Sequence, residues 1–176
     1  DSGNYTKKFS NGSIIFVSGE PHNHPICGDK NCTDNHSTAE FSVLTLNDLG
    51  EKTLNETGIP YYYRDLPEGN WYLTGDFKPD ATLRITGKVN LCLNGYSIIP
   101  TEGECVIRID GSDTADLTLC DCSEAQSGKI TTNLNGRGVS VTKGSFTMYG
   151  GEIRGNKANT NDGGGVYTLG TFNLIS

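Results

Sequence analysis

Short apolar-x-apolar triplets recur along the second half of the chain at an interval of about 28 residues. The clearest four are Val89–Leu91, Leu117–Leu119, Phe146–Met148 and Phe172–Leu174. The alternation within each triplet has period two, which indicates strands, and no long segment shows the 3.6-residue period of an amphipathic helix. Residues that favour turns, such as Asn94-Gly95, are dense between the triplets.

Each repeat unit contains two further short apolar segments, exemplified by Lys129–Thr131 and Val139–Val141. Three short strands per unit at this interval are typical of a parallel β-helix, whereas the hairpins of a β-sandwich require no such repeat. We therefore predict an all-β fold: a short right-handed parallel β-helix over residues 70–176, preceded by an N-terminal capping segment over residues 1–69. The capping segment contains a Cys/His loop at about residues 20–37. Because solenoids end in a capping element, the apolar last strand predicts that the natural chain continues beyond Ser176.

Composition and charge narrow the possible partners. Hydrophobic residues make up 34% of the 176 residues and there are 23 glycines, which suits the thin core of a solenoid. The formal net charge of −7 disfavours nucleic acid and anionic lipid as partners. No apolar stretch approaches the roughly 20 residues of a membrane span, so we expect no membrane insertion. We expect a monomer whose partner is a protein or a glycan.

The six cysteines favour an oxidising compartment and therefore a secreted or cell-wall-attached protein. Cys92 and Cys120 occupy the same position in consecutive repeat units, which predicts a disulfide between neighbouring coils. A ladder of reduced thiols is the alternative. Cys105 and Cys122 remain as a second pair by elimination.

All three histidines lie in the first 36 residues, close to the other two cysteines. The spacing predicts a structural zinc site with two imidazoles and two thiolates, formed by His24, Cys27, Cys32 and His36. Such an ion can order a loop that has no core of its own. A disulfide between Cys27 and Cys32 with solvated histidines is the alternative, and an oxidising compartment favours it.

A run of aromatic residues is the most interaction-like segment outside the repeats. It consists of Tyr61, Tyr62, Tyr63 and Arg64. Tyrosine and arginine are enriched at binding hot spots. Because side chains alternate along a strand, we expect at least one of these tyrosines to be exposed and to contact a partner. Closure of the cap over the first coil is the other interpretation.

Several segments resemble the β-helical repeat surface proteins of gut Firmicutes. The resemblance covers about residues 60–176 and is carried by Trp71–Asp76, Leu91–Ile98, Leu117–Cys122, Met148–Asn156 and Gly163–Tyr167. It implies a leader, β-helical repeats and a cell-wall anchor in the parent protein. Some Lachnospiraceae surface proteins of this type bind immunoglobulin variable regions as B-cell superantigens, so the resemblance also implies immunoglobulin as a possible host partner.

These observations together predict a non-catalytic extracellular binding module, an adhesin that contacts a host protein such as immunoglobulin, or a mucin or other host glycan. A polysaccharide-active β-helix enzyme is one alternative, and it would need paired carboxylates. The candidates are Asp110, Asp113, Asp116 and Asp121, but turn positions account for Asp113 and Asp116. A passive stalk or cap of a longer solenoid is the other alternative.

Overall fold

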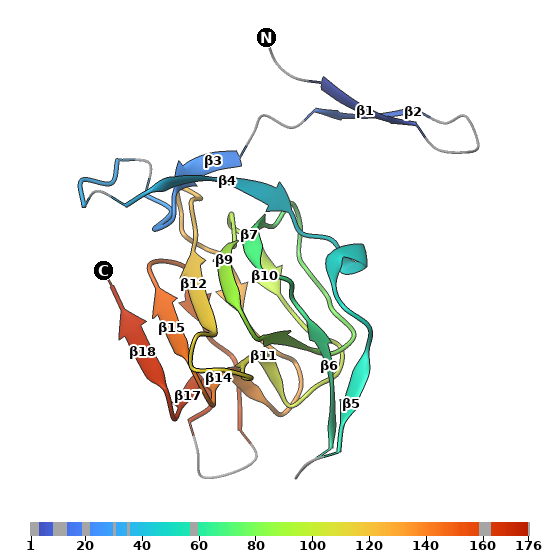
Figure 1. Cartoon of the computed structure of the whole chain (residues 1–176), viewed down its shortest axis with the longest axis vertical. Coiled ribbons are helices and arrows are strands. Elements are labelled where there is room, and N and C mark those ends of the chain that lie inside the picture. Colours follow the sequence, from blue (N-terminus) through green and yellow to red (C-terminus); the bar gives the residue numbers. More distant parts are fainter. Residues whose placement is uncertain are drawn as a thin grey trace.

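The fold is built almost entirely from β-strands (Figure 1). A computed structural model describes residues 4–8, 14–18, 22–29, 31–34, 36–56, 60–158 and 163–175, with side chains from residue 22 onward. Within these ranges the one helical element is a 3₁₀ turn, η1 (Leu46–Asp48). No helix in the described part of the chain is long and apolar enough to cross a membrane. The all-β class predicted from the sequence is confirmed.

Three sheets contain nearly all of these strands. The seven-stranded sheet has the order β18 (Thr171–Leu174), β15 (Ser145–Met148), β12 (Asp116–Cys120), β9 (Lys88–Cys92), β7 (Gly69–Tyr72), β4 (Thr38–Val43), β3 (His22–Pro25). The six-stranded sheet has the order β17 (Val166–Thr168), β14 (Arg137–Val141), β11 (Cys105–Ile109), β8 (Thr82–Ile85), β6 (Tyr61–Asp65), β5 (Thr53–Asn55). The three-stranded sheet has the order β10 (Ser97–Ile98), β13 (Lys129–Ile130), β16 (Glu152–Ile153). A separate antiparallel pair is formed by β1 (Asn4–Lys8) and β2 (Ile14–Ser18).

Successive strands visit the three sheets in the same order. The chain passes from β8 to β9 to β10, then from β11 to β12 to β13, and then from β14 to β15 to β16, so that each group pairs in parallel with the group before it. Parallel pairing begins before residue 70, because β6 already pairs with β8. The antiparallel partners β3 and β5 lie at the outer edges of their sheets.

The register agrees with the repeat read from the sequence. Val89 pairs with Leu117, Leu117 with Phe146, and Phe146 with Phe172, so the first residues of the four triplets form one column across the seven-stranded sheet. Val89, Leu117 and Phe146 are fully buried. The column lies in the core because residues at alternate strand positions point to the same face of a sheet. The predicted alignment of the triplets is therefore confirmed.

One hydrophobic core cluster draws its residues from all three sheets. Each sheet contributes fully buried aliphatic side chains, such as Leu83 and Ile107 from the six-stranded sheet and Ile98 and Ile130 from the three-stranded sheet. Two cysteines of the seven-stranded sheet, Cys92 and Cys120, are buried outside this core, in a second apolar cluster with Phe41. Something other than the main core therefore covers the outer face of this sheet.

Candidate functional site

The β3–β4 hairpin forms the edge of the seven-stranded sheet and packs over the outward side chains at the ends of β9 and β12. β4 pairs in parallel with β7, and Phe41 of β4 packs with Cys92 and Cys120 in the second apolar cluster. The loop that joins β3 to β4 approaches closely at Gly28, where an added Cβ would lie 3.0 Å from the Cβ of Cys120. Gly28 also has a φ of +82°, which favours glycine. The Cys/His-containing segment is thereby placed directly against the repeat strands.

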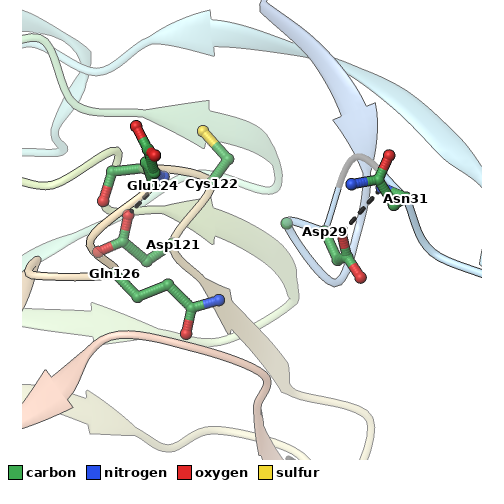
Figure 2. A pocket seen from close by; sticks show the side chains of 8 residues that line it. Asp29, Asn31, Asp121, Cys122, Glu124 and Gln126 are labelled. Carbon is green, nitrogen blue, oxygen red and sulfur yellow. Dashed lines mark hydrogen bonds between the residues drawn. The ribbon is translucent and has the colours of Figure 1, made fainter.

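A hollow of about 350 Å³ separates part of this loop from the turn that follows β12. Figure 2 shows Asp29 and Asn31 on one side and Cys122, Glu124 and Gln126 on the other. The hollow is polar and shallow. Two groups of side chains that could ligate a metal ion lie in this region, one in the loop and one between the hairpin and the repeat strands.

The loop cluster consists of Cys27, Cys32 and His36. Their ligand atoms all lie within 4.8 Å of one another, and Cys32 Sγ is 3.1 Å from His36 Nδ1. Burial raises the pKa of the Cys27 thiol, while a hydrogen bond from that thiol lowers the pKa of Cys32. The hydroxyl of Tyr149 lies 3.3 Å from His36 Nε2 and orients the ring. The cluster opens onto a cavity of about 440 Å³, so three protein ligands here leave room for a fourth ligand or a bridge between the two cysteines.

The strand cluster consists of His22, His24, Cys92 and Cys122. The ligand atoms of all four lie within 4.8 Å of one another, and Cys122 Sγ is 3.4 Å from His22 Nε2. The two histidines come from β3, Cys92 ends β9, and Cys122 follows β12. A hydrogen bond with Cys92 and burial together raise the pKa of the Cys122 thiol. This cluster contains the two thiols and two imidazoles of a complete tetrahedral ligand set.

The structure thus divides the predicted zinc ligands between two places. Cys27, Cys32 and His36 lie together as predicted, but His24 belongs to the strand cluster. The physical reason is strand alternation: His22 and His24 are two positions apart in β3, so both rings lie on the same face of the hairpin, the face that meets Cys92 and Cys122. The alternating His-Asn-His pattern is a local signal for a shared face. Nothing local in the sequence brings Cys92 and Cys122 to these rings.

The structure places the four cysteines of the two predicted disulfides in different surroundings. Cys92 and Cys120 are register partners in adjacent strands, as the repeat alignment requires, yet both are free thiols, like the other four cysteines. The hydrogen bond between these two thiols, with burial, raises the pKa of Cys92 to about 12. Cys105 lies in β11 of the six-stranded sheet, where burial raises its pKa to about 12. Cys122, the partner predicted for Cys105 by elimination, lies instead among the ligands of the strand cluster.

The tyrosine run is divided between the two faces of β6. Tyr61 is only 8% exposed. Tyr63 lies on the same face beneath the guanidinium of Arg84, whose Cζ atom is 3.9 Å from the centre of the Tyr63 ring. Tyr62 points the other way and is 43% exposed. It pairs across the hairpin with Leu54, which is 41% exposed. Tyr62 and Leu54 therefore form an exposed cross-strand pair, whereas Tyr61 and Tyr63 pack against the sheet.

Charged groups border this exposed pair. The Lys52 ammonium lies 4.7 Å from the centre of the Tyr62 ring and forms an ion pair with Glu102. Arg64, on the same face of β6 as Tyr62, forms an ion pair with Asp80 and donates a hydrogen bond to the carbonyl of Leu46. Leu46 is itself 46% exposed. We refer to Leu54 and Tyr62 as the exposed patch, an apolar cross-strand pair with a charged rim.

Asp121 has a structural role that the sequence did not reveal. Its carboxylate is buried and accepts hydrogen bonds from three backbone N–H groups, those of Gly95 and Ser123 at 2.9 and 3.0 Å and that of Gly128 at 2.6 Å. It therefore joins the turn after β9 to the turn after β12. The sequence made Asp121 a candidate catalytic carboxylate, but both of its oxygens accept hydrogen bonds from backbone N–H groups.

Replacing Asp121 with Ala is expected to lower the free energy of unfolding by about 2–3 kcal/mol, because three backbone donors lose a charged acceptor in a buried turn. The exposed turn residue Asp113, changed to Ala, is the matched control and should change stability by less than about 0.5 kcal/mol. Urea denaturation followed by circular dichroism measures both. Equal stability of the two variants would contradict the role assigned to Asp121.

Comparisons of the chain with protein families, with curated proteins and with solved structures found no match.

Proposed function

We propose that the chain is a non-catalytic binding module of a secreted or cell-wall-attached bacterial protein, with a right-handed parallel β-helix as its scaffold. Three sheets whose repeat strands pair in parallel and are visited in a constant order support the scaffold. Right-handed connections are the rule for parallel strands within one sheet. The cysteine content and the resemblance to surface proteins of gut Firmicutes support the extracellular location.

The observation that carries the binding proposal is the exposed patch. Exposed aromatic and aliphatic side chains in direct cross-strand contact are a recurrent feature of protein interfaces, particularly where charged groups surround them. Tyr62 supplies a rigid aromatic ring at a low cost in conformational entropy. A protein partner fits this chemistry, and the resemblance to B-cell superantigens makes immunoglobulin the first host protein to test. A mucin or other glycan is the competing partner.

The carboxylates support a non-catalytic role. Asp121 is bonded to three backbone donors, Asp110 accepts from the Arg108 guanidinium at 3.1 Å, and Asp116 accepts from the Ser145 hydroxyl at 2.5 Å. Glycosidic hydrolysis requires two carboxyl groups free to donate or accept a proton at the scissile bond. These three groups instead stabilise turns and neighbouring strands.

The test is retention of host proteins on the immobilised chain. We expect selective retention of immunoglobulin from human serum. Tyr62→Ala should weaken it by about tenfold or more, since loss of a hot-spot aromatic costs about 2 kcal/mol. Tyr96→Ala is the matched control, because Tyr96 is 38% exposed and lies in a turn remote in sequence from the patch. Mass spectrometry identifies the retained proteins, and biosensor titration gives the affinities.

Retention of mucins from mucus extract in place of immunoglobulin would redirect the proposal to a glycan partner. Equal binding by the Tyr62→Ala and wild-type chains would exclude the exposed patch as the contact surface. If no protein or glycan were retained selectively, the binding function itself would be wrong for this chain.

A further inference from the structure

We propose that the strand cluster binds one zinc ion in a closed tetrahedral site that fastens the β3–β4 hairpin to the repeat strands. Its ligands are His22 and His24 of the hairpin with Cys92 and Cys122 of two successive repeat units. This site differs from the ligand set that the sequence spacing predicts, and it is independent of the exposed patch. Its failure would leave the proposed binding function untouched.

The first argument is the spacing of the ligand atoms. In a tetrahedral zinc site, Zn–S bonds of about 2.3 Å and Zn–N bonds of about 2.0–2.1 Å hold the ligand atoms roughly 3.3–3.8 Å apart. Cys122 Sγ and His22 Nε2, at 3.4 Å, already have this separation. All other pairs are within 4.8 Å, so small side-chain rotations bring four ligands onto one ion.

The second argument is the state of His24. This ring is 2% exposed, and its Nδ1 atom lies 2.6 Å from the carbonyl of Pro25. Since a carbonyl only accepts, Nδ1 carries the proton and Nε2 presents a lone pair. Nε2 is buried and has no hydrogen-bond partner. Buried polar atoms rarely lack a partner, and a histidine whose other nitrogen donates to a carbonyl is the usual form of a zinc ligand.

The surrounding side chains hold both imidazoles in place. The His22 ring stacks on Tyr72 with 4.0 Å between centroids, and the His24 ring stacks on Phe41 at 4.2 Å. Two thiolates and two neutral imidazoles form a ligand set that suits zinc, and four protein ligands leave no position for a reactive water molecule. The inferred role is therefore structural. The ion would connect residues as far as 100 positions apart in sequence.

The site competes directly with the Cys92–Cys120 disulfide that the repeat alignment predicts. Cys92 cannot be both a zinc thiolate and half of a disulfide. Cys120 is the register partner of Cys92 but is not among the four clustered ligands. This neighbouring pair of cysteines therefore supplies a variant and its matched control.

The first experiment measures zinc per chain by inductively coupled plasma mass spectrometry in protein purified without chelator. Relative to wild type, Cys92→Ser should lose one zinc ion per chain, while Cys120→Ser should retain the wild-type content. His36→Ala distinguishes zinc bound by the two clusters. This variant should lose any zinc held by the loop cluster and keep the ion of the strand cluster. Equal zinc in the Cys92→Ser and wild-type proteins would overturn the proposal, as would a Cys92–Cys120 disulfide in the purified wild-type chain.

A second experiment does not require the Cys92→Ser variant to fold. Cobalt(II) is titrated into zinc-depleted His36→Ala protein, in which the loop cluster lacks its imidazole. We expect the intense visible absorption of tetrahedral cobalt bound by thiolate, with saturation at one equivalent. Weak absorption typical of octahedral cobalt, or no saturable absorption, would show that the strand cluster is not a metal site.

Discussion

Phe146→Ala is expected to lower the free energy of unfolding by about 3–5 kcal/mol. Phe146 is completely buried, and its ring stacks on that of Phe172 with 5.1 Å between centroids. Its other register neighbour, Leu117, is also completely buried. The neighbouring side chains are close-packed in their own positions, so they cannot move into the cavity that alanine leaves. Relaxation of the structure therefore recovers little of the lost free energy of unfolding.

Urea denaturation measures this loss, and two variants calibrate it. Phe146→Leu keeps most of the buried volume and should cost about 1–1.5 kcal/mol. Thr147→Ala changes the adjacent, partly exposed position of the same strand and should cost less than about 0.5 kcal/mol. A cost for Phe146→Ala no larger than that for Thr147→Ala would mean that this column is not the core of the folded protein.

Gly144→Ala is expected to destabilise the protein by about 3 kcal/mol or more. Gly144 has a φ of +81°, and an added Cβ would lie 2.0 Å from the carbonyl oxygen of Ala115. That oxygen accepts the hydrogen bond from the N–H of Ser145 at 2.9 Å. The methyl group would therefore force apart the turns that precede β12 and β15 and break the first hydrogen bond between these strands.

Gly75→Ala is the matched control for this prediction. Gly75 also lies in a turn, but an added Cβ there would have no atom within 4 Å and its φ is outside the left-handed region. We expect a change of less than about 1 kcal/mol, and it could be stabilising because alanine restricts the unfolded chain. Thermal unfolding of both variants tests the difference. Similar midpoints would contradict the close approach assigned to Gly144.

Repetition is the reason that the parallel strands could be predicted from the sequence. A triplet such as Val89–Leu91 reports the side-chain alternation of one strand, and its recurrence reports which residues align between strands. The register of Val89, Leu117 and Phe146 followed directly from the interval between their triplets. The chain before residue 70 has no repeat, and there the sequence did not reveal that β6 already belongs to the parallel stack or that β4 pairs with β7.

Alternation along one strand also limited what could be predicted for the tyrosine run. It required neighbouring tyrosines to point in opposite directions, which the structure bears out for Tyr61 and Tyr62. It did not say which face is covered. That outcome depends on β5, which places Leu54 beside Tyr62, and on Arg84 of the next repeat unit, which covers Tyr63.

The sequence by itself determined the all-β class, the column of core residues and the alignment of Cys92 with Cys120, because each depends on periodicity that local side-chain patterns record. Only the tertiary structure decided the grouping of the metal-ligating side chains. His24 lies near Cys27 along the chain, but strand alternation turns its ring toward Cys92 and Cys122. Spacing along a chain reports ligands that share a loop, whereas ligands on packed strands meet through the fold.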